Sequence, residues 1–241
     1  MGIALEQRLA KAAELVDLAL RASTGLQDRE RKLVTYWTLA THMLPHVNVF
    51  PLLVLRGKMG PGKSETLNTI AKLAYQPHPF NLRGNTLSVI RDALVASHQD
   101  AAIAEEADQG WKDELSFERL VSDRYHRQSA QTGKMEKSGD NWMSTTKHTC
   151  GATVLHRRTP FNDAALDGRS IAIRFRFDAT RQYTEVGDDL PWIVEGSELM
   201  KGFVFAPVAI DQPQGVAPRI FNTYRPLFVI GSCVGTKASH S

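Results

Sequence analysis

The spacing of apolar residues divides the chain into helical and strand-like segments. Apolar positions recur every three or four residues in 3–22 and 28–43, which predicts two amphipathic N-terminal helices. Further along, short continuous apolar runs alternate with segments of helical spacing. We expect strands at 50–55, 80–82, 101–104, 152–155 and 170–175, and helices at 65–73, 87–97 and 113–127. This alternation predicts an α/β fold whose mainly parallel five-stranded sheet is flanked by helices.

Local signals and changes in pattern suggest how the chain is organised. Asn85 or Thr86 is expected to cap the helix that follows it, because a short polar side chain there can accept a hydrogen bond from a free backbone N–H. The polar, glycine-containing stretch 128–142 is expected to be a loop. We therefore predict a helical N-terminal portion at 1–45, a core at 46–180 and a helical or irregular extension at 181–241.

One motif stands out between the first predicted strand and the helix after it. Residues 57–64 read Gly-Lys-Met-Gly-Pro-Gly-Lys-Ser and match G-x-x-x-x-G-K-[ST] at every fixed position. Such a P-loop curls backbone N–H groups around phosphates, while its lysine contacts them and its hydroxyl holds Mg²⁺. A glycine turn joining a strand to a helix is the structural alternative. The residues expected to contact ATP are Gly57, Gly60, Pro61, Gly62, Lys63, Ser64 and Glu65.

The third predicted strand ends in Glu105-Glu106-Ala107-Asp108. A P-loop hydrolase needs one carboxylate to support the Mg²⁺ shell and another to polarise the attacking water. We expect Glu105 and Ser64 to bind Mg²⁺. We expect Glu106 to polarise the attacking water. Aspartate is usual at the first position, so Glu105 departs from the pattern. A solvated acidic turn or a helix start is the alternative interpretation.

Basic residues follow the later strands. A polar residue at the end of the fourth strand can sense the γ-phosphate in ring-forming ATPases, and His156 or Arg157 fits that position. A nearby arginine can reach the nucleotide of the neighbouring subunit and stabilise charge that develops during transfer. Arg169 is our first choice for this catalytic arginine and Arg158 the second. The alternative is that these arginines are surface charges or partners of carboxylates.

Composition sets broad limits on the kind of protein. The 241 residues are 42% hydrophobic and 23% charged, as in ordinary globular proteins, and the net charge of +3 gives no strong overall attraction to nucleic acid. Cys150 and Cys233 have no metal-ligand spacing, which favours reduced thiols in a cytoplasmic protein. The first residues do not resemble a secretory signal, and no apolar run reaches membrane-spanning length.

The order of these motifs resembles the ATPase domain of primase- and helicase-associated proteins of phages, plasmids and integrated elements. The segments that carry the likeness are Thr41-His42, the P-loop, the acidic segment, 124–127, 165–174 and 219–227. It covers roughly residues 35–230. The resemblance implies a P-loop ATPase of the AAA+ type or close to it, which uses ATP and Mg²⁺ and works as a homo-oligomer. In that family an arginine of the last segment can touch bound nucleotide.

Contact with single-stranded DNA is a further expectation. The stretch after the third strand contains Lys134, Lys137 and Lys147 together with Tyr125 and Trp142. Lysines bind phosphates and aromatic rings stack on bases, and such stretches often face the pore of ring ATPases. A flexible solvated loop is the alternative interpretation. His126 and His148 lack metal-ligand spacing.

Three functions remain open from the sequence. The preferred one is a Mg-dependent, helicase-like ATPase that acts on DNA during replication or mobility of a phage-like element. The second is a regulatory or scaffold protein that binds ATP with little hydrolysis, which the substitution at Glu105 motivates. The third is a small-molecule kinase that uses the same loop, although no arginine-rich lid is evident.

Overall fold

The computed structural model describes residues 4–57, 62–82, 85–105, 114–139, 141–175 and 183–235. Helices occupy a large part of these ranges. They are α1 (Leu5–Ser23), α2 (Asp28–Ala40), the 3-10 helix η1 (Thr41–His46), α3 (Lys63–Leu73), α4 (Leu87–Ala96), α5 (Glu114–Asp123), α6 (Ala164–Asp167), α7 (Pro191–Met200) and α8 (Pro218–Gly235). The strands are β1 (Leu52–Arg56), β2 (Pro77–Asn81), β3 (Ala101–Glu105), β4 (Gln131–Ser138), β5 (Asn141–His148), β6 (Ala152–Arg157) and β7 (Ser170–Arg174).

Five of the strands form one parallel sheet in the order β2-β3-β6-β1-β7. They coincide with the five strands that the sequence predicts, within a few residues at each end. β1 pairs with β6 on one side and with the edge strand β7 on the other. Because all five strands run the same way, their carboxyl ends meet at one edge, where the β1–α3 connection also lies. A parallel sheet with this connection is the P-loop NTPase fold.

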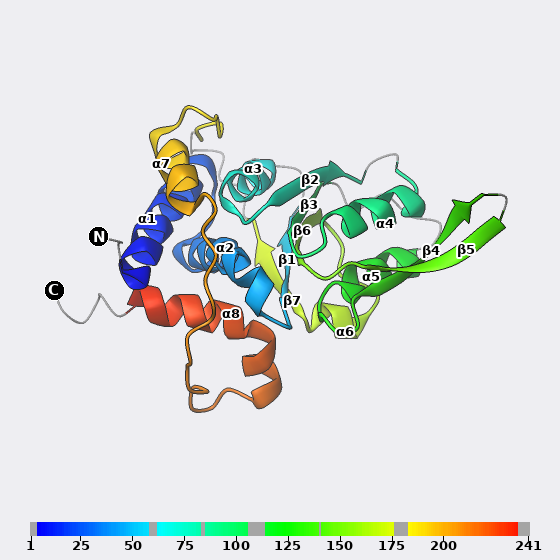
Figure 1. Cartoon of the computed structure of the whole chain (residues 1–241). Coiled ribbons are helices and arrows are strands. Elements are labelled where there is room, and N and C mark those ends of the chain that lie inside the picture. Colours follow the sequence, from blue (N-terminus) through cyan, green and yellow to red (C-terminus); the bar gives the residue numbers. More distant parts are fainter. Residues whose placement is uncertain are drawn as a thin grey trace.

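Alternate residues of β1 face two separate cores. Leu53 and Leu55 pack in the larger core with α1, α2, α3, α7 and α8, whereas Leu52 and Val54 pack in the smaller core with α4, α5 and α6. The sheet is therefore covered on both faces, as expected for parallel strands (Figure 1). Of the helices that the structure describes, none combines the length and apolarity needed to cross a bilayer. Both cysteines are buried and unbridged.

Side-chain caps define where two of the helices start. The Thr86 hydroxyl accepts from the backbone N–H of Val89 at the start of α4, which confirms one of the two predicted caps. Asp163 caps α6 through the N–H groups of Ala165 and Leu166. Each cap satisfies donors that have no partner within their own helix.

The expectation of a loop at 128–142 is wrong. β4 and β5 form an antiparallel hairpin, paired from Gln131↔His148 to Ser138↔Asn141, that projects from the body of the molecule (Figure 1). Exposed and half-buried residues fill both strands, and no residue in either strand is fully buried. The hairpin therefore lacks the apolar alternation by which a half-buried strand is recognised.

A buried arginine joins α4, β6 and the turn before β3. The Arg124 guanidinium donates five hydrogen bonds, one to the Thr153 hydroxyl at 2.8 Å and four to backbone carbonyls. The carbonyls belong to Leu94, Ser97, Asp100 and Ala152, and their distances are 2.7–3.2 Å. Burial lowers the pKa of Arg124 to about 10. Carbonyl dipoles at the end of α4 offset part of the cost of burying this charge.

Gly151 leaves the space that this guanidinium occupies. A Cβ at position 151 would collide with Arg124 Nη2 and lie 2.5 Å from the Asp100 carbonyl oxygen. We predict that Gly151→Ala lowers the free energy of unfolding by about 1–3 kcal/mol, because either the arginine or the backbone must shift. Urea unfolding monitored by circular dichroism would measure the change.

Gly133→Ala is the matched control, since a Cβ there meets open space on the hairpin. Its effect should stay within about 0.5 kcal/mol. Equal stability of the two variants would show that the packing around Arg124 tolerates an added methyl group.

Candidate nucleotide-binding site

The candidate site lies where β1 ends and α3 begins. β1 stops at Arg56 and α3 starts at Lys63, so the glycine-rich motif spans the connection between a buried parallel strand and a helix N-terminus. The N–H groups of the first helical turn have no partners within the helix, and the helix dipole adds positive potential there. This arrangement suits an anion, most often a phosphate. Gly60 and Pro61 lie outside the described residues.

Gly62 requires a conformation that favours glycine. It is the N-cap residue of α3 and has φ +109° and ψ −21°. A Cβ there would also lie 3.4 Å from the Phe175 ring and from the Gly25 nitrogen. The Gly62 carbonyl accepts from the Thr66 N–H at 2.9 Å and from its hydroxyl at 2.6 Å, which closes the first turn of α3.

Phe175 is a neighbour of the loop that sequence reasoning missed. It directly follows β7, and its N–H donates to the Arg56 carbonyl at 2.9 Å. Its Cβ would lie 3.3 Å from a Cβ at Gly57, and its ring contacts the position of a Cβ at Gly62. Phe175 therefore packs against both ends of the glycine-rich connection. An aromatic residue after a strand gives no sequence signal for such a contact.

The three residues after Gly62 occupy different environments. Lys63 is only 4% exposed, and its ammonium lies 6.0 Å from the centre of the Phe175 ring. Ser64 is exposed on the first turn of α3. The Glu65 carboxylate accepts from the backbone N–H of Val186 at 2.8 Å, so it anchors the segment before α7.

Glu105 lies on the same edge of the sheet as the glycine-rich connection. It ends β3, and only β6 separates β3 from β1. Two strand spacings put the backbones of β3 and β1 about 10 Å apart, a span that a glutamate side chain, a metal ion and a hydroxyl can bridge. The Glu105 side chain is half-buried. Glu106, Ala107 and Asp108 lie outside the described residues.

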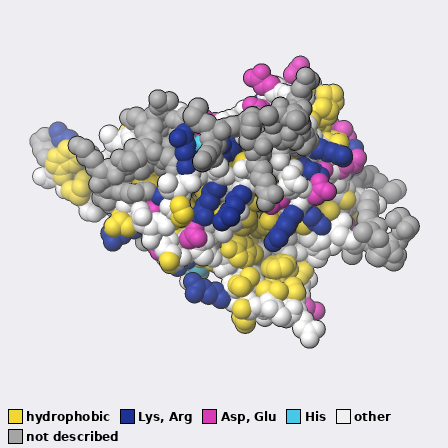
Figure 2. All heavy atoms as spheres, turned by 180° about the vertical axis from the view of Figure 1, so that it is seen from behind, with side chains coloured by type: hydrophobic (Ala, Val, Ile, Leu, Met, Phe, Trp, Pro, Cys, Tyr) yellow, Lys and Arg dark blue, Asp and Glu magenta, His cyan; other side chains and the backbone are white. Residues whose placement is uncertain are grey.

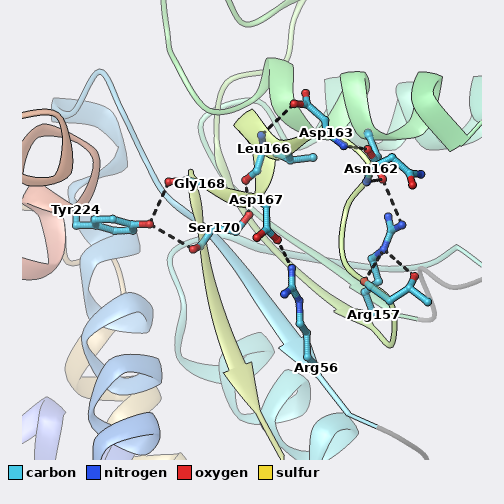
Figure 3. Close-up of polar contacts among 11 residues, drawn as sticks. Arg56, Arg157, Asn162, Asp163, Leu166, Asp167, Gly168, Ser170 and Tyr224 are labelled. Atoms are coloured by element: carbon cyan, nitrogen blue, oxygen red, sulfur yellow. Dashed lines mark hydrogen bonds and ion pairs between the residues drawn. The ribbon is translucent and has the colours of Figure 1, made fainter.

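Three arginines stand in register on adjacent strands at this edge. Arg56 of β1 is paired with Arg157 of β6 and with Arg174 of β7, so their side chains leave the same face of the sheet. Arg56 forms an ion pair with Asp167 of α6, drawn in Figure 3. The sequence analysis assigned no role to Arg56 or Arg174, because the alignment of the three arginines depends on strand order and register.

Arg157 is buried and already bound by protein groups. Its Nη2 lies 3.2 Å from a carboxylate oxygen of Glu118, and its Nε donates to the Thr159 carbonyl at 3.0 Å (Figure 3). The two Glu118 oxygens also accept the backbone N–H groups of Asn162 and Asp163, both at 2.9 Å. This network fixes the loop after β6. His156 precedes Arg157 and therefore points to the other face of the sheet.

Arg169 lies at the opposite edge of the sheet. Its carbonyl accepts from Leu52 at the start of β1, and four residue steps of about 3.3 Å separate Leu52 from Arg56. The guanidinium packs over the Tyr125 ring at 4.9 Å, and Nη1 donates to the Ser122 hydroxyl at 3.2 Å. Arg169 is thus remote from the glycine-rich loop of its own chain.

The Thr41-His42 segment is buried at the far end of α3. The ring nitrogens of His42 contact the Phe203 carbonyl at 2.8 Å and the Leu73 carbonyl at 3.0 Å. Leu73 ends α3, roughly 15 Å along the helix axis from Lys63. Burial lowers the pKa of His42, and its contacts join α3 to the segment after α7.

Comparisons with known proteins give only distant structural similarity. Neither a protein-family model nor a curated protein matches the chain. A structure of JCV helicase is 15% identical with a TM-score of 0.44 and covers 99% of this chain and 62% of that one. A second, with a bound phenoxyphenyl acetamide compound, is 14% identical with a TM-score of 0.38 and covers 95% and 55%. The chain thus spans between one half and two thirds of these helicase chains.

We predict that Gly62→Ala weakens nucleotide binding at least tenfold, because the added methyl group strains the backbone and presses on Phe175. The strained conformation alone costs about 1–3 kcal/mol. Titration with a fluorescent ATP analogue measures the affinity, and urea unfolding measures the stability.

Gly202→Ala provides the control for backbone strain. Gly202 also has a left-handed conformation, with φ +62°, but a Cβ there meets open space. This variant should lose stability and keep its nucleotide affinity. Unchanged affinity in Gly62→Ala would contradict the proposed position of the phosphates.

Proposed function

We propose that the chain is a Mg²⁺-dependent P-loop ATPase of the helicase-like class that acts on DNA. The observation that carries this proposal is the glycine-rich connection from a buried parallel strand to the N-terminus of α3, with Glu105 on the same edge of the sheet. In the proposed division of the chain, residues 46–180 form the ATPase core, 1–45 the helical N-terminal portion and 181–241 the extension.

The phosphates are bound by backbone N–H groups and one lysine. Gly60, Gly62 and the start of α3 supply N–H donors, and the Lys63 ammonium supplies the charge. Burial of Lys63 against Phe175 restricts its side chain before nucleotide arrives. The remaining binding residues are Gly57, Pro61, Ser64 and Glu65.

Oxygen donors on both sides of the site suit Mg²⁺, which prefers hydroxyl, carboxylate and phosphate oxygens. The exposed hydroxyl of Ser64 and the half-buried carboxylate of Glu105 would hold the ion. When bound there, Mg²⁺ would supply positive charge to the phosphate oxygens.

Hydrolysis requires an activated water and a cation on the transferring group. Glu106 would accept a hydrogen bond from the water whose oxygen attacks the γ-phosphorus, while the bond to the bridging oxygen breaks, ADP leaves and the water's proton passes to the released phosphate. Arg169 cannot serve its own nucleotide from the opposite edge of the sheet, and this supports action on the nucleotide of a neighbouring subunit in a homo-oligomer. An isolated subunit then turns over slowly.

The β4–β5 hairpin supports contact with single-stranded DNA. Lys134 pairs with Asp92 and Lys147 with Glu136, each at 3.1 Å. Lys137 has no ion pair within the described part of the chain and lies opposite Trp142, which is 65% exposed. A free cation beside an exposed aromatic ring suits a phosphate and a stacked base. Lysine and arginine side chains also gather near the middle of the face seen in Figure 2.

A nucleotide-binding scaffold with little hydrolysis is the second candidate. Glu105 favours it, because its side chain is one methylene longer than the usual aspartate and shifts a bound ion. ATP binding without phosphate release would support the scaffold, and phosphate transfer to an added acceptor would support a kinase.

We predict that Lys63→Ala lowers the rate of phosphate release from Mg-ATP at least about 100-fold, because a charge on the transferring group is lost. Turnover is measured with and without single-stranded DNA, and the wild type should be stimulated by DNA. Lys72→Ala is the control, since Lys72 lies on the same helix and pairs with the exposed Asp188. Equal turnover of Lys63→Ala and wild type would refute the assignment.

We further predict that Trp142→Ala weakens binding of a single-stranded oligonucleotide by about 1–3 kcal/mol, the usual value of one stacked base. Fluorescence anisotropy of a labelled oligonucleotide measures the affinity. Met143→Ala is the matched control, because Met143 is 55% exposed and points to the other face of the hairpin. Equal affinity of both variants and the wild type would remove the hairpin from the DNA site.

A further inference from the structure

Arg169 is held by side chains from two elements that are distant in sequence. One is the end of α5, where the Tyr125 ring lies under the guanidinium at 4.9 Å and the Ser122 hydroxyl accepts a hydrogen bond. An arginine stacked on an aromatic face is attracted to the ring electrons and loses access to other rotamers. Tyr125 therefore limits the directions in which Arg169 extends.

The other element is α8. Two consecutive residues of α8 contact Tyr125 and the backbone on either side of Arg169. The Thr223 and Tyr125 hydroxyls lie 2.8 Å apart and share a hydrogen bond, and Thr223 is buried. The Tyr224 hydroxyl donates to the carbonyls on either side of Arg169, Gly168 at 3.4 Å and Ser170 at 3.3 Å (Figure 3). A tyrosine hydroxyl is protonated at neutral pH and can donate, and burial raises the pKa of Tyr224 further from that range.

We propose that Tyr125, Thr223 and Tyr224 are positioning residues that orient Arg169 toward the nucleotide of a neighbouring subunit. Tyr224 fixes the backbone on both sides of Arg169, and Thr223 fixes the ring on which its guanidinium rests. The inference rests on the proposed action of Arg169 on a neighbour. It goes further by making α8, near the end of the chain, a determinant of that action.

Pre-organisation is the physical reason for this assembly. A free arginine side chain loses rotamer entropy when it is fixed in one geometry. Because Tyr125 holds Arg169 in the folded chain, this entropy is lost when the chain folds. It is then not lost again when the neighbour's reaction reaches its transition state. Loss of the ring should therefore lower kcat and leave KM for ATP unchanged, because nucleotide is bound by the other edge of the sheet.

Mixed oligomers test which subunit needs the assembly. Lys63→Ala chains keep Arg169 but should not hydrolyse ATP themselves. Arg169→Ala chains keep Lys63 and should hydrolyse ATP only when a neighbour supplies Arg169. A mixture of the two should therefore regain turnover. Tyr125→Leu added to the Lys63→Ala chain should lower kcat of the mixture about tenfold. Tyr125→Leu on the Arg169→Ala chain should change kcat of the mixture little, because that chain has no Arg169 to position. Equal losses on both chains would overturn the proposal, because they indicate a general structural role.

Conservative variants separate the ring from the hydroxyl. Tyr125→Phe keeps the surface under Arg169 and loses the bond to Thr223, so it should lower kcat, but less than Tyr125→Leu does. Tyr224→Phe on the arginine-donating chain should lower kcat, whereas the exposed neighbour Asn222→Ala should not. Identical behaviour of Tyr224→Phe and Asn222→Ala would exclude the Tyr224 hydroxyl from the positioning of Arg169.

A nucleotide-independent measurement separates this inference from the proposed function. In the 241-residue chain, the Nε–H resonance of Arg169, assigned with Arg169→Lys, should carry a ring-current shift that disappears in Tyr125→Leu. A resonance that does not move overturns the positioning role even if the protein hydrolyses ATP. A shift that disappears as expected, in a protein whose mixtures regain no turnover, supports the assembly and refutes the action of Arg169 on a neighbour.

Discussion

The burial of one arginine, which pairs with no carboxylate among the described residues, constrains how α4, β3 and β6 pack. Arg124 can be desolvated only if several acceptors face it, and these come from the end of α4, the turn before β3 and the start of β6. The same hydrogen bonds therefore fix β3 relative to β6. Glu105 ends β3, and the loop bound by Glu118 follows β6. The distance between Glu105 and this loop at the carboxyl edge of the sheet therefore depends on the Arg124 contacts at the amino edge.

The length of the parallel strands separates the candidate nucleotide-binding residues from Arg169. At the carboxyl ends lie the glycine-rich connection, Lys63 and Glu105, and at the amino ends lies Arg169 with its aromatic support. Under the proposed function, one chain would carry both halves of a catalytic site without being able to bring them together by itself. Association of chains is then a requirement of the proposed chemistry and need not be a separate level of regulation.

The sequence predicts what depends on short-range pattern. Apolar runs predict the five strands, the glycine-rich motif marks the β1–α3 connection, and a hydroxyl predicts the cap at Thr86. The hairpin has two solvated faces and gives no such pattern. The contact of Phe175 with Gly62 and the pair of Arg157 with Glu118 join residues 39 or more positions apart, and a single sequence carries no record of which distant side chains meet.

β7 runs from the amino edge of the sheet to the carboxyl edge. Arg169 precedes its first residue, and Phe175, packed against both ends of the glycine-rich connection, follows its last. β7 is an extended strand that pairs with β1 along its whole length. If Arg169 acts on a neighbouring subunit as proposed, β7 would link that contact to Phe175. The proposed contact between subunits and the glycine-rich connection would then lie at the two ends of one strand.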